Sequence, residues 1–167
     1  MARKHGHIRA GARGHGHDVP GGFGDHGNPR DFQLMLGRLE DPDRARWQRP
    51  AALVRALRLR RGQTVAEIGA GSGYLVRRIA RAIGPRGRVY AVDVEPRMLP
   101  VLLERLRRAR IGNVTPVLGY DDDPLLPDRS CDLVLVVNTY HHFPGGPRYL
   151  RRLARILRPG GRLVNVD

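Results

Sequence analysis

The feature that most constrains the fold is a glycine-rich segment placed directly after a short apolar run. Residues 64–68 (TVAEI) predict a β-strand, and residues 69–73 read GAGSG. Because glycine lacks a Cβ, this backbone can turn tightly and approach a ligand closely. Residues 73–83 carry apolar side chains at helical spacing, and a helix offers free N–H groups at its first turn. Strand, glycine loop and helix in this order predict a ligand-binding turn.

The rest of the chain continues the alternation of strands and helices. An unbroken apolar run, LVLVV, lies within 131–137 and suits a strand that is buried on both faces. The pattern predicts an α/β fold, a doubly wound and mostly parallel sheet, whose ligand binds at the carboxyl ends of the strands. The further predicted elements are strands at 88–92, 114–118, 131–137 and 162–166, a helix from Pro96 to Gly112, a helix at 147–157, and a turn at Pro159-Gly160-Gly161.

Three segments are predicted along the chain. Residues 1–28 are rich in glycine, histidine and arginine and lack an apolar period, which predicts a flexible N-terminal segment. Residues 29–61 hold short apolar clusters, with helix starts expected at Asp41-Pro42 and at Pro50, and predict an N-terminal helical lid. Residues 62–167 form the expected ligand-binding domain.

Several classes of protein are disfavoured by composition. No run approaches the ~18 apolar residues of a membrane span, and the N-terminus does not resemble a secretory signal. The single cysteine, Cys131, allows no disulfide within the chain, which is compatible with a cytoplasmic protein. No metal site is predicted, although the histidines of the N-terminal segment leave nickel or zinc binding open as the less favoured alternative: His5, His7, His15, His17 and His26.

The chain is strongly basic, with a formal net charge of +14. Residues 1–61 and residues 62–167 each carry +7, so the charge is not a detachable tail. A basic surface attracts nucleic acid without specificity, and a solvated arginine-rich surface is the equally weighted alternative. The outer face of the helix predicted at 147–157 would make the contact, through Arg148, Arg151, Arg152, Arg155 and Arg158.

An acidic residue follows the second predicted strand at a spacing from the glycine-rich segment that is typical of ribose-binding acids. Asp93 lies 20 residues beyond Gly73, where a carboxylate can accept hydrogen bonds from both hydroxyls of a ribose. Tyr74 occupies the position where the dinucleotide fingerprint has glycine or alanine, which disfavours a nicotinamide dinucleotide. The sequence therefore predicts a nucleoside-containing ligand other than NAD.

Four successive segments resemble the motifs of class I S-adenosylmethionine-dependent methyltransferases. They are VAEIGAGSGYL, VYAVDVEP, the acidic loop before CDLVLVVN, and LRPGGRLV, and together they cover roughly residues 50–167. The resemblance implies a Rossmann-like methyltransferase core with S-adenosylmethionine as its cofactor. Family members usually continue for two more strands, which this chain apparently lacks. The fifth strand would then be a sheet edge, left by a fragment or a minimal variant, or covered by a partner or by a second copy in a homo-oligomer.

The resemblance also assigns roles to individual residues. Glu67 matches the acid that helps hold the amino group of the cofactor, and Asp93 matches the acid that binds the ribose. Either Asp121 or Asp122 faces the adenine amino group. The cofactor-binding residues implied are Glu67, Gly69, Ala70, Gly71, Gly73, Asp93, Val94, Asp121, Asp122 and Asn138.

The segment after the fourth strand is where an acceptor would react. Methyl transfer needs an aligned acceptor and, where required, a base, and His141, His142 and Asn138 are the catalytic candidates. Packing of the loop is the alternative role of the histidines. Thr139 and Tyr140 replace the prolines typical of enzymes that methylate exocyclic base amines. A small-molecule acceptor is therefore favoured. A nucleic-acid methyltransferase and a catalytically silent binding module remain alternatives.

Overall fold

A single parallel β-sheet organises the chain. The computed structural model describes residues 31–167, so the predicted flexible segment 1–28 and its histidines lie outside the described residues. The strand order is β3-β2-β1-β4-β5, with every pairing parallel, which confirms the predicted doubly wound sheet. Successive strands run outward from β1 to β3 and then return to β4, so the order reverses between β1 and β4. The strands are β1 (Thr64–Ile68), β2 (Arg88–Asp93), β3 (Val114–Leu118), β4 (Cys131–Val137) and β5 (Leu157–Val166).

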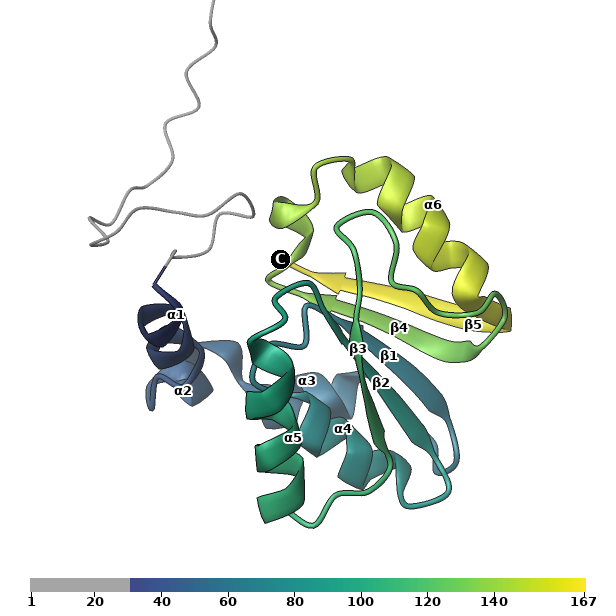
Figure 1. Ribbon diagram of the computed structural model, residues 1–167. Coiled ribbons are helices and arrows are strands. Elements are labelled where there is room, and N and C mark those ends of the chain that lie inside the picture. Colours follow the sequence, from purple (N-terminus) through teal and green to yellow (C-terminus); the bar gives the residue numbers. More distant parts are fainter. Residues whose placement is uncertain (1–30) are drawn as a thin grey trace, which may run out of the picture.

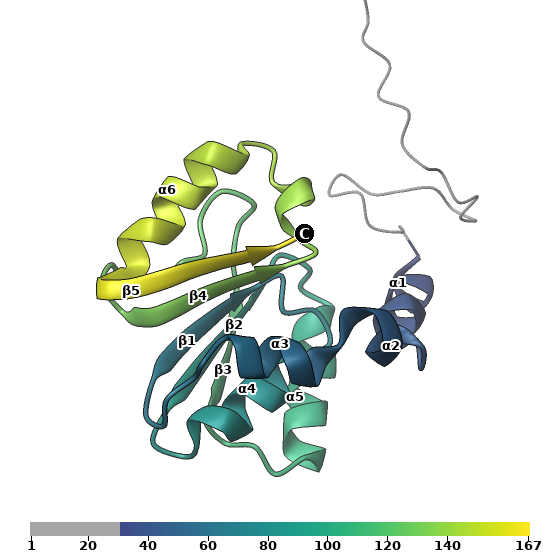
Figure 2. The same cartoon turned by 180° about the vertical axis from the view of Figure 1, so that it is seen from behind.

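Helices cover both faces of the sheet (Figures 1 and 2). One face is covered by α3 (Pro50–Ala56), α4 (Val76–Ile83) and α5 (Met98–Arg108), and the other by α6 (Gly146–Ile156). The helices α4, α5 and α6 each bury one apolar stripe at helical spacing, as α6 does with Tyr149, Leu153 and Ile156. Among the described residues, no helix is long and apolar enough to cross a membrane.

The strand β4 lies at the centre of the core. Leu133 and Leu135 pack into the apolar cluster beneath α4 and α5, whereas Val134 and Val136 pack into the cluster beneath α6. Side chains of a strand alternate between its two faces, and both faces are covered here. This double burial explains why residues 133–137 of β4 are apolar at every position rather than at every second one.

Two short helices precede the sheet domain and lie at the carboxyl ends of the strands (Figure 1). They are α1 (Phe32–Leu39) and α2 (Arg44–Gln48). The side chain of Asp31 caps α1 by accepting hydrogen bonds from the N–H groups of Gln33 and Leu34. The expected start of α2 at Asp41-Pro42 is wrong, because the Asp41 carboxylate accepts the N–H of Asp43 at 2.8 Å and closes a turn instead.

The predicted turn at Pro159-Gly160-Gly161 is also wrong. These residues lie within β5, which begins directly after α6 at Leu157. The pairing with β4 is irregular there, since Cys131 pairs with Leu157 and Leu133 pairs with Arg162. An edge strand bonds on one side only, so it tolerates a proline without an N–H and a Gly160 at φ +76°.

Candidate active site

A cavity of about 330 Å³ opens at the carboxyl ends of the strands, where the strand order reverses. This is the position at which open α/β sheets bind ligands. The walls come from the loops after β1, β2, β3 and β4, from α5 and α6, and from helices α1 and α2, which we call the lid helices. The cavity is lined by Met35, Arg38, Leu39, Arg44, Trp47, Ile68, Gly69, Gly71, Val92, Asp93, Val94, Glu95, Met98, Asp121, Val137, Asn138, Thr139, His142, Phe143 and Tyr149.

The glycine loop after β1 is shaped by its bonds to β2. The N–H groups of Gly69 and Ala70 both donate to the carbonyl oxygen of Val92, at 2.9 and 3.0 Å. Gly69 and Gly73 have φ values of +73° and +81°, in the left-handed region that favours glycine. Gly69 lines the cavity, whereas Ala70 and Gly73 do not. A Cβ on Gly73 would lie 2.4 Å from Cδ1 of Leu102, so this glycine permits close packing of α5.

Asp93 connects the end of β2 to the glycine loop and also lines the cavity. Its Oδ2 accepts the N–H of Gly71 at 2.6 Å, and its Oδ1 accepts the N–H of Glu95 at 3.0 Å. Burial raises the pKa of this carboxyl group, while the bonds from Glu95 and Gly71 act in the opposite direction. A carboxylate offers about four acceptor positions, so acceptor capacity remains for a hydroxyl group of a ligand. Val94, the next residue, also lines the cavity.

Glu67 is the most deeply buried acid of the described chain. Its side chain is 4% exposed, does not line the cavity, and leaves Oε2 without a hydrogen-bond partner. Burial raises its pKa to about 8; the positive charge of Arg44 lowers the pKa and the negative charge of Asp93 raises it. An unpartnered buried carboxyl group of this kind favours the approach of a cation, which stabilises the ionised form.

The lid helices are fastened to the glycine loop by charged side chains. Arg44 donates to the carbonyl oxygen of Leu39 at 2.6 Å, and its guanidinium lies 4.4 Å from the ring centre of Tyr74. Glu40, which ends α1, accepts hydrogen bonds from Ser72 and Arg105. These contacts hold α1 and α2 over the cavity.

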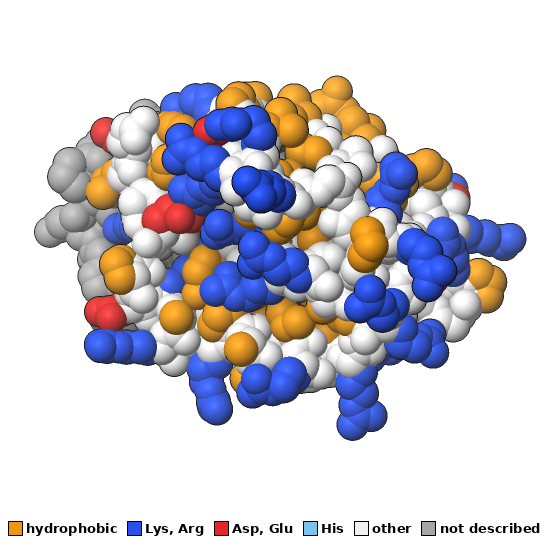
Figure 3. Space-filling view, turned by 90° about the horizontal axis from the view of Figure 1, so that it is seen from below, with side chains coloured by type: hydrophobic (Ala, Val, Ile, Leu, Met, Phe, Trp, Pro, Cys, Tyr) orange, Lys and Arg blue, Asp and Glu red, His pale blue; other side chains and the backbone are white. Residues whose placement is uncertain are grey.

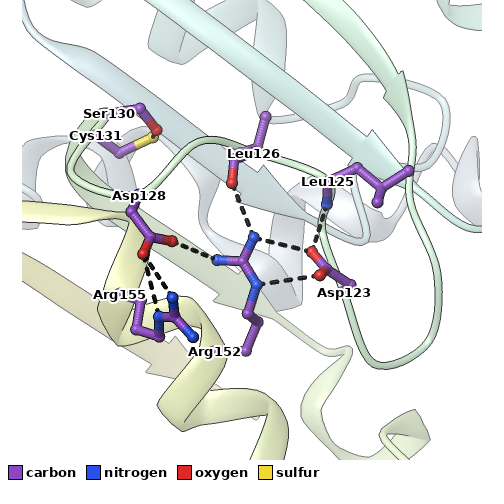
Figure 4. Close-up of polar contacts among 8 residues, drawn as sticks. All are labelled: Asp123, Leu125, Leu126, Asp128, Ser130, Cys131, Arg152 and Arg155. Atoms are coloured by element: carbon purple, nitrogen blue, oxygen red, sulfur yellow. Dashed lines mark hydrogen bonds and ion pairs between the residues drawn. The ribbon is translucent and has the colours of Figure 1, made fainter.

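The acidic loop between β3 and β4 is held by α6 (Figure 4). Arg152 donates from Nε to Asp123 at 3.2 Å, from Nη1 to Asp128 at 3.2 Å, and from Nη2 to the carbonyl oxygen of Leu126 at 2.9 Å. Of the two candidate adenine-binding acids in this loop, Asp121 lines the cavity and Asp122 does not. Arg152 therefore positions the segment that carries Asp121.

The same contacts neutralise much of the arginine face of α6. Arg155 pairs with Asp128 at 2.8 Å, and Arg158 pairs with Asp132 at 3.0 Å. Together with Arg152, three of the five arginines that the sequence suggests for nucleic-acid binding are thus committed to intramolecular ion pairs.

The loop after β4 separates the catalytic candidates. Asn138, at φ +49°, and His142 line the cavity. His141 points elsewhere: its side chain is 56% exposed, and its Nδ1 lies 2.8 Å from Oδ1 of Asp167. The rings of the two histidines lie 4.0 Å apart, centre to centre. Among the catalytic candidates, only Asn138 and His142 are therefore placed to contact a ligand in the cavity.

Sequence reasoning missed most of the apolar wall of the cavity. Phe143 and Tyr149 pack edge to face with ring centres 4.5 Å apart, and Met35 and Trp47 close the wall from the lid. The helical spacing of Tyr149 with Leu153 signals burial, but it does not reveal that the ring borders a cavity. Within residues 31–167, no group of three or more histidine, cysteine or acidic residues is arranged to hold a metal ion.

The strand order and the position of the cavity are those of a Rossmann-like fold, which class I S-adenosylmethionine-dependent methyltransferases share. A family model for the methyltransferase domain matches residues 65–161, more than half of the chain, and the chain belongs to this family. It is 36% identical to the demethylmenaquinone methyltransferase of Tropheryma whipplei over 131 residues, which is 78% of this chain and 50% of that protein.

Two further similarities agree with this family. The ubiquinone/menaquinone biosynthesis C-methyltransferase of an Enterobacter species is 34% identical over 110 residues, covering 65% of this chain and 44% of that protein. A crystal structure of an S-adenosylmethionine-dependent methyltransferase from Aquifex aeolicus superposes with a TM-score of 0.75 at 26% identity, over 79% of this chain and 70% of that one. The chain spans about half the length of the curated relatives it matches.

Proposed function

We propose that this chain binds S-adenosylmethionine in the cavity and transfers its methyl group to a small molecule. The observation that carries the proposal is the contact between Asp93 and the N–H of Gly71, because it brings the glycine loop and a carboxylate to one wall of the cavity. The bound cofactor would supply an electrophilic methyl group on a sulfonium centre. The protein side chains would hold the cofactor, orient the acceptor and remove a proton from it.

Three carboxyl groups fit the polar groups of this cofactor. Glu67 is buried, lacks a partner at Oε2, and would favour the cationic amino group. Asp93 would accept hydrogen bonds from the ribose hydroxyls, and Asp121 from the adenine amino group. The backbone of Gly69 and Gly71 allows the close approach that a side chain at either position would restrict.

The acceptor would lie against the apolar and aromatic wall of the cavity. Met35, Phe143 and Trp47 suit a flat, largely apolar molecule. The names of the two curated relatives point to a quinone or its reduced form, and we propose this class of acceptor. His142 is placed to remove a proton from an acceptor hydroxyl or carbon, and Asn138 to orient the acceptor by hydrogen bonding.

The alternative functions draw less support from the described residues. A nucleic-acid methyltransferase that used the arginine face of α6 would find three of its five guanidinium groups already paired with acids. A catalytically silent module would bind the cofactor without turning over any acceptor. Measurement of binding and of turnover separates this module from an enzyme.

The first test is calorimetric titration with S-adenosylhomocysteine, the demethylated form of the cofactor. We expect micromolar binding by the wild-type chain and a loss of about 10- to 100-fold in Asp93→Asn, because an amide replaces a charged acceptor. Asp43→Asn removes the same charge from an exposed lid residue that does not line the cavity, and it should bind like the wild type. Absence of binding by the folded wild-type chain would overturn the proposal.

The acceptor class is tested by turnover. With S-adenosylmethionine and a reduced naphthoquinone, we expect formation of S-adenosylhomocysteine above the rate without acceptor, and a rate at least tenfold lower in His142→Ala. Cofactor binding without turnover on quinols or other small aromatic acceptors would favour the silent module.

A further inference from the structure

A second hollow, of about 490 Å³, lies at the amino-terminal ends of the strands, opposite the cofactor cavity. It is formed by the connection from α4 to β2 (84–87) and the connection from α5 to β3 (109–113), which lie at the bottom of Figure 1. Four exposed arginines line it, and a fifth, Arg61, lies over its edge with its guanidinium beside Gly84. We call this hollow the amino-end groove, with its five arginines Arg61, Arg81, Arg86, Arg88 and Arg110.

The charge of the amino-end groove is not neutralised by neighbouring acids. No aspartate or glutamate lies in 57–63, 84–88 or 109–113, the connections that surround it. The ion pairs of the described residues engage other arginines, among them Arg152, Arg155 and Arg158 on α6. Figure 3 views the molecule from below, and it shows basic side chains spread over this face with few acidic ones. Among the described residues, the groove therefore concentrates positive charge that no ion pair neutralises.

Helix capping does not account for these arginines. Arginine near the end of a helix often binds the last carbonyl groups. At the end of α4, however, the side-chain amide of Asn113 donates to the carbonyl oxygens of Ala80 and Gly84, at 3.0 and 2.9 Å. The carbonyl oxygen of Ile83 accepts the N–H of Gly62 at 2.8 Å. Because other donors occupy these carbonyl groups, the guanidinium groups stay available for a ligand.

The floor of the groove is tightly packed backbone around two buried glycines. A Cβ on Gly87 would lie 2.7 Å from Cγ1 of Ile83 and 2.8 Å from the carbonyl oxygen of Gln63. Gly84 and Gly87 are both buried, while Arg86 between them is exposed. Guanidinium groups that project from a fixed floor are suited to binding phosphate oxygens.

We propose that the amino-end groove binds the phosphate backbone of a nucleic acid. Five neighbouring arginines that form no ion pair within residues 31–167 match a polymer of regularly spaced phosphates better than a single small anion. The described aromatic side chains do not line the groove, so base stacking and sequence preference are not expected. The large exposed apolar side chains all lie in other segments, so the groove lacks the apolar wedge with which proteins enter a bilayer surface.

The position of the groove makes it a docking surface rather than an acceptor site. Strand β2 runs from Arg88, which lines the groove, to Asp93, which lines the cofactor cavity. At about 3.3 Å per residue, the two sites lie roughly 17 Å apart. The proposal is independent of the acceptor of methyl transfer, because it concerns the opposite end of the sheet.

The test compares two double variants of the full chain that carry the same net charge. Arg86→Gln with Arg110→Gln removes two charges from the groove, and Arg148→Gln with Arg151→Gln removes two exposed charges from α6. Binding of a fluorescent single-stranded RNA of 20 nucleotides is followed by anisotropy at several salt concentrations. The basic N-terminal residues are common to all three proteins, so they do not affect the comparison. Titration with S-adenosylhomocysteine verifies that both variants remain folded.

We expect the groove variant to bind the RNA about tenfold more weakly at ~0.1 M salt. The slope of the logarithm of the binding constant against the logarithm of the salt concentration should become shallower by about 1.4, because each of the two lost phosphate contacts contributes ~0.7. The α6 variant should change by less than twofold. Equal losses in the two variants would show general charge attraction and overturn the proposal. So would RNA affinity that is unaffected by the groove variant, or groove-dependent binding of phosphatidylserine vesicles in place of RNA.

Discussion

Gly69 and Thr139 join the two loops that meet where the strand order reverses: a Cβ on Gly69 would lie 2.3 Å from Oγ1 and 2.9 Å from Cβ of Thr139. The loop after β1 and the loop after β4 therefore touch only because residue 69 has no side chain. Both residues line the cavity, so this contact lies in its wall between the central strands β1 and β4.

Gly69→Ala should lower the free energy of unfolding by about 2–4 kcal/mol, because it combines a left-handed φ of +73° with a steric clash. Gly160→Ala is the matched control, since φ is +76° there and nothing lies within 4 Å of the added Cβ. Urea denaturation should show a loss of only about 1 kcal/mol for the control. In the double variant Gly69→Ala with Thr139→Ala, the smaller residue 139 should recover part of the stability that Gly69→Ala loses. If the losses of the two single variants simply added up in the double variant, the contact would be contradicted.

The buried Glu67 should make both stability and cofactor binding depend on pH. Its pKa is raised to about 8 in the folded chain, so its contribution to stability is fully present below its unfolded pKa, ~4.5, and is lost as the pH rises toward 8. Relative to Glu67→Gln, the wild type should lose about 2–4 kcal/mol between pH 5 and pH 9, measured by urea denaturation. Parallel pH profiles for the two proteins would contradict this assignment.

Cofactor binding near pH 7 should release a proton from Glu67, because the cationic amino group of the ligand favours the carboxylate. Calorimetry with S-adenosylhomocysteine in buffers of different ionisation enthalpy measures the number of protons released. The apparent enthalpy should vary with the buffer for the wild type and not for Glu67→Gln.

The neighbouring acids Asp121 and Asp122 offer an internally matched comparison. Asp121 lines the cavity and Asp122 does not, although both are exposed and carry the same charge. Asp121→Asn should weaken binding of S-adenosylhomocysteine about tenfold through loss of a charged acceptor, and Asp122→Asn by less than twofold. If both substitutions weakened binding alike, the effect would come from the negative electrostatic potential of the whole loop and not from contact with the adenine.

The strand alternation and the glycine loop predict the sheet correctly, because burial on both faces leaves an unmistakable apolar run in β4. The two errors have different causes, one a long-range strand pairing and the other a local side-chain hydrogen bond. At Pro159-Gly160-Gly161 the local sequence predicts a turn, but one-sided pairing of β5 with β4 keeps the segment extended. At Asp41-Pro42 the side chain of Asp41 closes a turn before α2 begins.

In the candidate site, too, some residues could be predicted from the sequence and others depend on tertiary contacts. Asp93, which lies 20 residues beyond the glycine motif, could be placed from spacing alone, because parallel strands bring their carboxyl ends together. The difference between His141 and His142 could not, since it depends on the contact of His141 with Asp167, 26 residues away. The lid residues Met35 and Trp47 carry no local signal of a ligand wall and emerge only from tertiary packing.

Arg152 should support cofactor binding without touching the cofactor. Its guanidinium bonds Asp123, Asp128 and the carbonyl oxygen of Leu126, and so fixes the loop that carries Asp121. In Arg152→Gln we expect faster amide hydrogen exchange in 119–130 and binding of S-adenosylhomocysteine about three- to tenfold weaker, because the loop must be ordered on binding. Arg151→Gln, on the same helix but exposed and without an ion pair among the described residues, is the control for charge. If Arg152→Gln loosened the loop without weakening binding, Asp121 would not need its support to hold the adenine.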